Sequence, residues 1–111
     1  TGEELAAAYL SEKGYEILET NWRFRRYELD IIARKEDTII VAEVKTRKSL
    51  YGGMPEESVT RQKQKSMVRA ANAYILLKEY DEEVRFDIIS VILKGDEVIL
   101  YQIEDAFYAL M

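Results

Sequence analysis

Apolar residues recur along the chain at two spacings, one typical of helices and the other typical of strands. The first helical pattern is formed by Leu5, Ala6, Tyr9 and Leu10. It predicts a helix over residues 2–13, with glutamates in its first turn and Gly14 at its end. The second helical pattern is formed by Met67, Ala70, Ala71, Tyr74 and Ile75. It predicts a helix from about residue 59 to residue 79, whose apolar stripe should pack on a sheet.

Five segments have the apolar content expected of strands. They are residues 15–19, 26–34, 38–47, 84–93 and 97–102. Turns at residues 35–37 and 94–96 join the second segment to the third and the fourth to the fifth as antiparallel hairpins. In the second segment, alternation is expected to place Leu29, Ile31 and Ala33 on one face, and Glu28, Asp30 and Ile32 on the other.

Two further segments complete the expected architecture. Residues 48–57 predict a flexible loop, whose Gly52 and Gly53 suit either close approach of a ligand or an ordinary connection. Residues 105–111 predict a short closing helix. The order helix, three strands, helix, two strands predicts an α/β fold of the mixed α+β kind, with a mixed five-stranded sheet flanked by helices. A chain of 111 residues, 48% of them hydrophobic, is expected to form a single domain over residues 1–111.

The composition excludes several kinds of chemistry. The chain contains no cysteine and no histidine, so disulfides, thiolate nucleophiles, Ser-His-Asp triads and imidazole-ligated metals cannot form. Catalysis would have to use carboxylates, lysine, arginine, tyrosine or bound water, and carboxylate ligands favour Mg²⁺ or Mn²⁺. Because no apolar run is long enough to span a bilayer and no signal-peptide pattern appears, we expect a cytoplasmic protein that has no membrane partner.

Charge is distributed unevenly along the chain. The formal net charge of -5 argues against a generic nucleic-acid binder. Residues 45–69, however, carry seven basic and two acidic side chains, a net charge of +5. This block supplies a candidate DNA-binding surface, formed by Arg47, Lys48, Arg61, Lys63 and Lys65. The alternative is that these charges form the solvated face of one helix.

Asp30, Glu43 and Lys45 are the strongest candidates for chemistry. Glu43 and Lys45 are two residues apart on a predicted strand, so both side chains leave the same face of the sheet. The apolar surroundings make a carboxylate beside an ammonium costly unless a metal or substrate compensates. Asp30 is an isolated acid on the neighbouring predicted strand. Pairing of the two strands would bring Asp30 close to Glu43 only in a suitable register, which the sequence does not define.

The same residues carry a resemblance to a known family. The chain resembles the PD-(D/E)XK nuclease superfamily and, within it, the YraN-like family, which is similar to archaeal Holliday junction resolvases. The matching stretches are residues 2–3, 5–6, 14–15, 21–23, 28–33, 43–47, 63 and 85–87. They extend over nearly the whole chain in order, which makes the match far more specific than a lone Glu-x-Lys. The chain departs from the superfamily pattern at Asp30, which follows leucine instead of proline, and at the two glycines of the 48–57 loop.

The resemblance implies a restriction-endonuclease-like core and a metal-dependent site. Asp30 and Glu43 would ligate Mg²⁺ or Mn²⁺ together with the Val44 backbone carbonyl, and Lys45 would lie beside the attacking water. The alternative for Lys45 is a salt bridge that only neutralises Glu43. Glu3 is the family's acidic residue in the first helix; the alternative is a glutamate that complements the helix dipole, with Glu4 as an equal rival.

Several other polar and aromatic residues could have either a functional or a structural role. Arg47 could clamp a phosphate or solubilise a strand end, and Lys63 could reach the DNA backbone or lie free on the surface. Glu28 is expected either beside the site or paired to Arg26 or Lys45. Trp22 and Tyr51 could stack on an unpaired base or belong to the core. A final pair, Arg85 and Asp87, is interpreted as a structural ion pair.

The resulting hypothesis is a metal-dependent DNA endonuclease. Its activity on branched DNA, or on DNA with single-stranded regions, is implied by the resolvase resemblance alone, as is a two-fold homodimer that presents two sites. The alternative is a non-catalytic nucleic-acid-binding or assembly module with the same fold, which the net charge of -5 favours. A hydrolase of small phosphorylated metabolites is weaker because no glycine-rich phosphate cradle is present.

Overall fold

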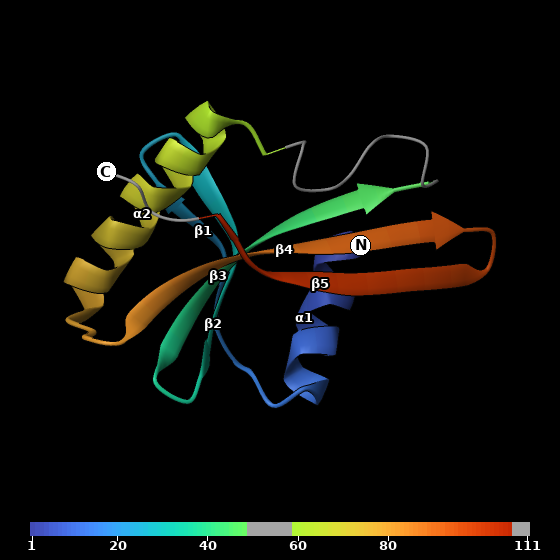
Figure 1. The fold of residues 1–111 in the computed structure, drawn as a ribbon, viewed down its shortest axis with the longest axis horizontal. Coiled ribbons are helices and arrows are strands. Elements are labelled where there is room, and N and C mark those ends of the chain that lie inside the picture. The colour runs from blue at the N-terminus through green and yellow to red at the C-terminus, as the bar shows by residue number, and fades with distance from the viewer. Residues whose placement is uncertain (49–58, 108–111) are drawn as a thin grey trace.

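The computed structural model describes residues 1–48 and 59–107 and contains two helices and five strands in that part of the chain (Figure 1). The elements are α1 (Gly2–Glu12), β1 (Glu16–Phe24), β2 (Tyr27–Lys35), β3 (Thr38–Arg47), α2 (Arg61–Lys78), β4 (Glu83–Lys94) and β5 (Glu97–Phe107). The predicted order of helices and strands is confirmed for the described residues. The predicted 48–57 loop lies outside them, apart from Lys48.

The five strands form one mixed sheet in the order β1-β2-β3-β4-β5. Neighbouring strands are antiparallel except for β3 and β4, which are parallel and are separated in the chain by α2. A parallel pair needs such a crossover because its two strands run the same way. Glu43 and Lys45 lie on β3, the central strand, so the candidate site is built at the middle of the sheet.

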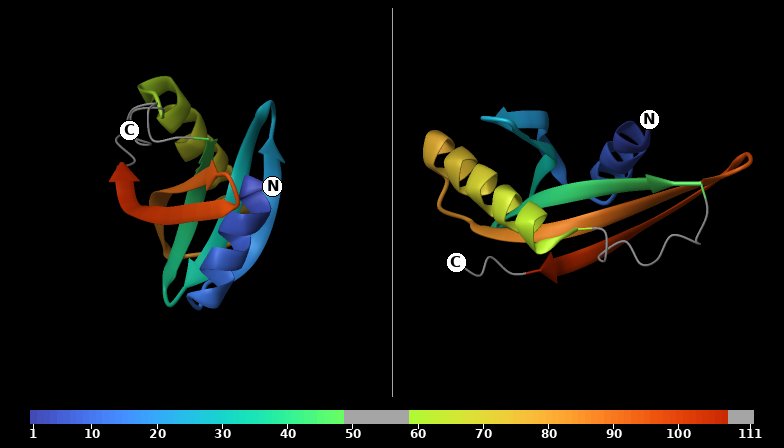
Figure 2. Two further views of the ribbon diagram at one scale, coloured as in Figure 1. Left: turned by 90° about the vertical axis from the view of Figure 1, so that its right-hand side faces the viewer. Right: turned by 90° about the horizontal axis from the view of Figure 1, so that it is seen from above.

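Each helix covers one face of the sheet (Figure 2, left). The core beneath α2 contains Leu29, Ile32, Ile39, Val41, Met67, Tyr74, Phe86 and Ile88, among others. The core beneath α1 contains Ala6, Leu10, Ile31, Ala33, Ile40, Ala42, Ile89 and Val91, among others. β3 and β4 are therefore buried on both faces, which explains their long apolar runs. Within the described residues, neither helix is long and apolar enough to cross a bilayer.

The simple alternation predicted for the second strand is wrong. Leu29 packs beneath α2, whereas Ile31 packs beneath α1, although strict alternation would place them on one face. The change of face occurs at Asp30, opposite Asn21 of β1, whose φ of +52° lies in the left-handed region. A left-handed residue in one strand of a hairpin rotates the strands about their axis, and asparagine tolerates this conformation better than most residues.

The predicted closing helix is also wrong where the structure describes it. Residues 105–107 continue β5, and residues 108–111 lie outside the described part. The Asp105 amide donates to Asp87 Oδ1 at 3.0 Å, and the Phe107 ring stacks on Phe86 with centroids 5.1 Å apart. These contacts with β4 are distant in sequence and override the local helical pattern. The first strand likewise extends to Phe24, beyond the predicted residues 15–19.

Arg85 and Asp87 form the structural ion pair that the sequence predicted. Two guanidinium nitrogens of Arg85 donate to the two Asp87 oxygens at 2.9 Å each, and Gln102 Nε2 adds a hydrogen bond of 2.8 Å. Arg85 and Gln102 also donate to the Tyr15 hydroxyl. The fully buried Asp87 carboxylate is thereby satisfied and ties β4 to β5.

Candidate metal and nucleic-acid site

Asp30 lies where β2 separates from β3. The antiparallel ladder of these strands runs from Lys35 opposite Thr38 to Ile31 opposite Ala42. One residue further on, the Val44 amide donates to Asp30 Oδ2 at 2.9 Å. A side-chain oxygen thus accepts the amide hydrogen bond at the end of the ladder, and the other Asp30 oxygen remains for a further partner.

Glu43 projects from β3 toward α2. It continues the face of Ile39 and Val41, and its side chain is only 8% exposed. Its Oε2 lies 2.7 Å from Lys63 Nζ and 3.7 Å from Lys45 Nζ. Lys63 therefore belongs to the candidate site, which it reaches from the first turn of α2, and is not a free surface lysine. The salt bridge considered for Lys45 is present but is the longer of the two.

The surroundings of Asp30 favour its protonated form. Burial raises the pKa of Asp30 from its ordinary 3.8 to about 6, against the lowering effect of the Val44 hydrogen bond. The charges of Glu43 and then Glu3 raise the pKa further, and Lys63 lowers it. Asp30 and Glu43 are thus close enough to repel each other. A cation between them would relieve both the repulsion and part of the desolvation.

The two lysines beside Glu43 have opposite properties. Burial lowers the pKa of Lys45, and the neighbouring Lys63 ammonium lowers it further. Burial is the largest single effect on Lys63 and acts to lower its pKa, but the hydrogen bond to Glu43 and the nearby charges of Glu43 and Asp30 together raise the pKa. Lys63 is therefore the firm counter-ion of Glu43, whereas Lys45 holds its proton less tightly and is the better proton donor.

Glu3, and not Glu4, faces the site. The Glu4 carboxylate accepts from the N-terminal ammonium at 2.7 Å in a capping box with Thr1, which leaves it exposed at the helix start. The Glu3 carboxylate accepts from Asn21 Nδ2 at 2.8 Å, and its charge contributes to the raised pKa of Asp30. The same Asn21 nitrogen donates to Glu28 Oε1 at 3.2 Å. Asn21 thus connects α1 to the β1–β2 hairpin.

Two buried hydroxyls in this region have no hydrogen-bond partner among the described residues: Tyr27 OH and Ser90 Oγ. Burial raises the pKa of Tyr27, and the charges of Glu43 and Asp30 raise it further, so this hydroxyl lies near both acids and stays neutral. The parallel register places Ser90 beside Lys45. A buried hydroxyl without a partner is costly, and both hydroxyls could donate to a bound phosphate or water.

The sequence interpretation did not assign roles to Asn21, Tyr27 or Ser90. Asn21 carried a signal, because it falls within the stretch 21–23 that resembles the nuclease family. Tyr27 immediately precedes the Glu28 to Ala33 stretch and could have been considered on that ground. Ser90 is a lone polar residue in the apolar run of β4, and nothing in its spacing indicated that it would lie beside Lys45.

The remaining predicted residues are spread over a wider area. Arg47 ends β3 on the face of Glu43 and Lys45 by strand alternation, and Lys48 follows it as an exposed residue. Arg61 and Lys65 are exposed on α2 and are not part of the acidic site. Glu28 pairs with Arg23 at 3.4 Å instead of the expected Arg26 or Lys45. Trp22 packs edge-on against Tyr74 at the core, which agrees with the core alternative given for it.

The donor set suits a small hard cation. Within residues 1–48 and 59–107, no group of three or more acidic side chains is arranged to hold a metal. Mg²⁺ commonly takes only one or two carboxylates and completes its shell with water and substrate phosphates. Asp30 and Glu43 supply two carboxylates. The N–H and C=O of one residue point to the same side of an extended strand, so the Val44 carbonyl faces the same side as the amide that binds Asp30.

Comparison with known families adds a further observation. Residues 2–91 match the model of the Uncharacterised protein family UPF0102. The chain belongs to this family. The UPF0102 chain is 46% identical to a UPF0102 protein of Flavobacterium psychrophilum, with 96% of this chain and 90% of that protein covered. It is 49% identical to a UPF0102 protein of Parabacteroides distasonis, with 97% and 89% covered.

The UPF0102 match confirms the family expected from the sequence. A relative in Chlorobium phaeobacteroides is 48% identical, with 97% of this chain and 91% of the relative covered. The matched region begins with α1 and extends into β4, so it contains Glu3, Asp30, Glu43, Lys45 and Lys63. Every acidic and basic side chain of the candidate site therefore lies in the part of the chain that this family shares.

Proposed function

We propose that the chain is a Mg²⁺- or Mn²⁺-dependent nuclease that hydrolyses phosphodiester bonds of DNA. One observation carries the proposal: the Val44 amide donates to Asp30 Oδ2 at 2.9 Å, which holds the Asp30 carboxylate on the neighbouring strand beside Glu43. Two partly buried acids that repel each other are unfavourable in a purely structural role. They are typical of a site that takes up a cation.

Three groups would hold the cation: Asp30, Glu43 and the Val44 carbonyl. When bound, a divalent cation lowers the pKa of water and offsets the charge that develops on a phosphate undergoing attack. Lys45 stabilises negative charge on the phosphate oxygens and, because its pKa is lowered, can give a proton to the leaving oxygen. The Tyr27 hydroxyl is available as a neutral hydrogen-bond donor to the same phosphate.

Incubation with DNA tests this proposal directly. Purified protein with Mn²⁺ or Mg²⁺ is expected to cut at least one of four DNA forms: duplex, flap, four-way junction or single strand. Asp30→Asn and Glu43→Gln are each expected to lower the rate by about 100-fold or more. The matched control is Asp96→Asn, an exposed acid in the β4–β5 turn, which should keep full activity. No cleavage, or cleavage equal in all four proteins, contradicts the proposal.

The proposed substrate shape rests on the resemblance to resolvases. We propose branched DNA as the preferred form, which requires two symmetric cuts and hence a two-fold dimer. Sedimentation of the protein alone and with a four-way junction tests this point separately. A strictly monomeric protein that cuts only one strand would contradict the preference for branched DNA and leave the nuclease proposal standing.

A second candidate function has its own support. Lys63 lies 2.7 Å from Glu43 and neutralises it without a metal, which is compatible with a non-catalytic nucleic-acid-binding or assembly module. Calorimetric titration with Mn²⁺ distinguishes the two functions. Binding that is lost in Asp30→Asn and Glu43→Gln supports the nuclease, and an absence of binding heat in the wild-type protein supports the module.

A further inference from the structure

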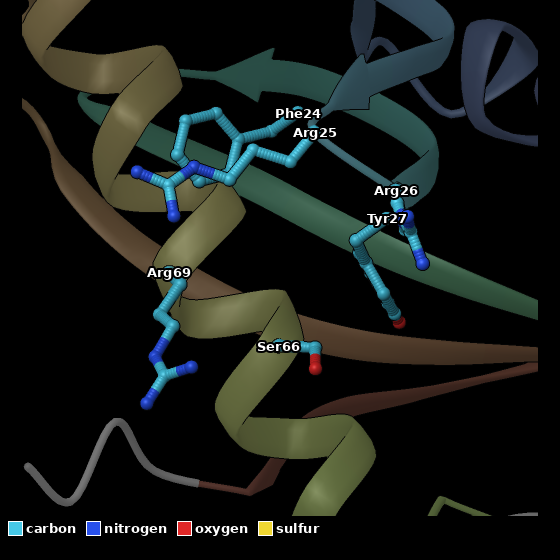
Figure 3. Close-up of a pocket in the computed structure, with 6 residues that line it drawn as sticks. All are labelled: Phe24, Arg25, Arg26, Tyr27, Ser66 and Arg69. Atoms are coloured by element: carbon cyan, nitrogen blue, oxygen red, sulfur yellow. The ribbon is translucent and has the colours of Figure 1, made fainter.

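A basic pocket lies between the β1–β2 turn and α2 (Figure 3). It has a volume of about 260 Å³. Six residues line it: Phe24, Arg25, Arg26, Tyr27, Ser66 and Arg69. We call these six residues the arginine pocket. The first four come from the hairpin turn, and Ser66 and Arg69 lie one helical turn apart on α2.

The charge of the arginine pocket is unbalanced. Within the described residues, none of its three guanidiniums forms an ion pair with a carboxylate. The chain as a whole has a net charge of -5, so acidic side chains are plentiful elsewhere. Three exposed guanidiniums without a carboxylate partner line one hollow, which favours an anionic ligand, and guanidinium geometry suits phosphate.

The hairpin turn holds one of these arginines in an unfavourable backbone conformation. Phe24 pairs with Tyr27, which leaves Arg25 and Arg26 as a two-residue turn. Arg25 has a φ of +58°, in the left-handed region that favours glycine, at the first turn position. The two-residue hairpin turn itself requires this conformation, and Glu36 adopts it at the same position of the β2–β3 turn. The turn thereby presents the exposed Arg25 side chain at the tip of the hairpin.

The pocket also contains a stacking surface. The Arg25 guanidinium lies over the half-buried Phe24 ring, 5.2 Å from its centroid. Nucleic-acid bases stack on phenyl rings and on guanidinium planes alike. The volume lies below the roughly 300 Å³ at which pockets for drug-sized ligands begin, so the pocket suits a small ligand such as one base. A paired base in a duplex has both faces covered and its edge engaged, which leaves an unpaired base as the fitting ligand.

Tyr27 joins the arginine pocket to the acidic site. It lines the pocket and lies on β2 three residues before Asp30, and its buried hydroxyl has no partner among the described residues. On α2, Ser66 of the pocket lies one helical turn from Lys63, which contacts Glu43 at 2.7 Å. A nucleotide in the pocket would therefore be adjacent to whatever phosphate occupies the acidic site. Phosphates and bases alternate along a DNA strand, so one strand can place a base in the arginine pocket and a neighbouring phosphate at the acidic site.

From these observations we infer that the arginine pocket binds one unpaired nucleotide of the DNA strand, next to the phosphate at Asp30 and Glu43. The base stacks on the Arg25 guanidinium, which the Phe24 ring supports from its other side, and Arg26 and Arg69 bind the flanking phosphates. The inference rests on the proposed nuclease function and specifies its substrate: DNA with an unpaired base beside the scissile bond.

Binding measured without metal tests the inference independently of catalysis. The probe is a fluorescein-labelled single strand of DNA of about ten nucleotides. Fluorescence anisotropy compares its binding with that of the same strand annealed to its complement, both in buffer containing EDTA. The wild-type protein is expected to bind the single strand at least about fivefold more tightly than the duplex. Equal or tighter binding of the duplex overturns the inference, and cleavage in Mn²⁺ would then remain a separate result.

Three variants locate the binding. Arg69→Gln is expected to weaken binding about fivefold and to reduce the slope of log affinity against log salt by about 0.7. Phe24→Leu is expected to weaken binding of the intact strand. It should not weaken binding of a strand that lacks the base which occupies the arginine pocket. The control Lys94→Gln removes an exposed charge at the β4–β5 turn, far along the sheet from α2 (Figure 1). A loss in Lys94→Gln as large as that in Arg69→Gln overturns the inference, because binding would then be unspecific.

Arg25→Gly separates binding from folding. Glycine relieves the left-handed strain, so this variant is expected to unfold at a temperature equal to or above that of the wild type while binding the single strand about fivefold more weakly. Unchanged binding in Arg25→Gly overturns the role of Arg25. Thymidine monophosphate serves as a competitor: if it binds as tightly as the strand, the pocket is a site for free nucleotides and the inference is wrong.

Discussion

The Lys63 ammonium and the Lys45 ammonium approach the same oxygen of Glu43, at 2.7 Å and 3.7 Å. One carboxylate thus serves two cations, and the closer cation comes from a helix while the other comes from its own strand. A divalent ion that bound Glu43 would compete with Lys63 directly. The structure has Lys63 on Glu43; under the proposed function, a second form would have the ion on Glu43 and Lys63 displaced toward a phosphate.

Removal of Lys63 should strengthen metal binding. Lys63→Gln takes away the cation nearest Glu43, so we expect Mn²⁺ to bind about 3- to 10-fold more tightly, because less positive charge opposes the ion. In the absence of metal, the same variant should lose about 1 kcal/mol of stability, because Glu43 loses its partner. Calorimetric titration and urea unfolding measure the two effects. Lys65→Gln, exposed on the same helix, is the control, and an equal change in both variants would refute the competition.

The charge of Asp30 should destabilise the metal-free protein. Its pKa is about 6 when folded and about 3.8 when unfolded, so the folded state favours the protonated form. The associated stability is present at low pH and is lost as the pH rises through about 6. After allowance for partial exposure, Asp30→Asn should be more stable than the wild type by about 1 kcal/mol at pH 8 and nearly equal to it at pH 4.

Urea unfolding in EDTA at the two pH values measures this difference. Asp96→Asn in the exposed β4–β5 turn provides the matched comparison. A gain in Asp30→Asn that is the same at pH 4 and pH 8 would show that the effect does not come from ionisation of Asp30.

Metal binding should be linked to the same proton. Asp30 has to lose its proton before it can bind a cation, so the apparent Mn²⁺ affinity should fall by up to about tenfold for each pH unit below 6 and level off above 7. Calorimetry in two buffers with different ionisation enthalpies should detect about one proton released per ion at pH 5.5 and almost none at pH 8. An affinity independent of pH between 5 and 8 would argue that the ion does not contact Asp30.

Close packing of α1 on β3 should depend on the absence of a side chain at Gly2. A Cβ at this position would collide with Thr46 Oγ1. Alanine is a better helix former than glycine, so any loss of stability in Gly2→Ala must come from this collision, and we expect a loss of about 1–2 kcal/mol. Thr46→Ala should relieve it, so that the double variant is more stable than Gly2→Ala alone. Thermal unfolding of the wild type, the two single variants and the double variant gives a double-mutant cycle. Stability changes that simply add would exclude a contact between positions 2 and 46.

Much of the fold was predictable because it depends on local patterns. The bounds of β3 agree with the prediction, and α2 lies within the predicted range, because continuous apolar runs and helical spacing are strong local signals. The end of β5 was not predictable in this way. Residues 105–107 form a strand because Asp105 and Phe107 contact Asp87 and Phe86, which are about twenty residues distant.

The residue types of the candidate site were predictable from the sequence, but the contacts between these residues were not. Glu43 and Lys45 share a face because side chains alternate along a strand. The position of Asp30 depends on the rotation of the hairpin at Asn21, and a left-handed asparagine gives no clear signal in a sequence. Lys63 reaches Glu43 only because α2 crosses this face of the sheet. The sequence therefore indicated which residues to consider, and tertiary packing determined their partners.

The hydrogen bond from Val44 to Asp30 has a consequence for ion selectivity. One carboxylate oxygen is engaged by the β3 backbone, so bidentate coordination of an ion by Asp30 would have to share this oxygen with the Val44 amide. The spacing of neighbouring strands then sets the size of the coordination sphere. Ca²⁺ prefers larger shells that often include bidentate carboxylates, whereas Mg²⁺ and Mn²⁺ accept compact octahedral ones. The sheet itself would thus discriminate against the larger ion.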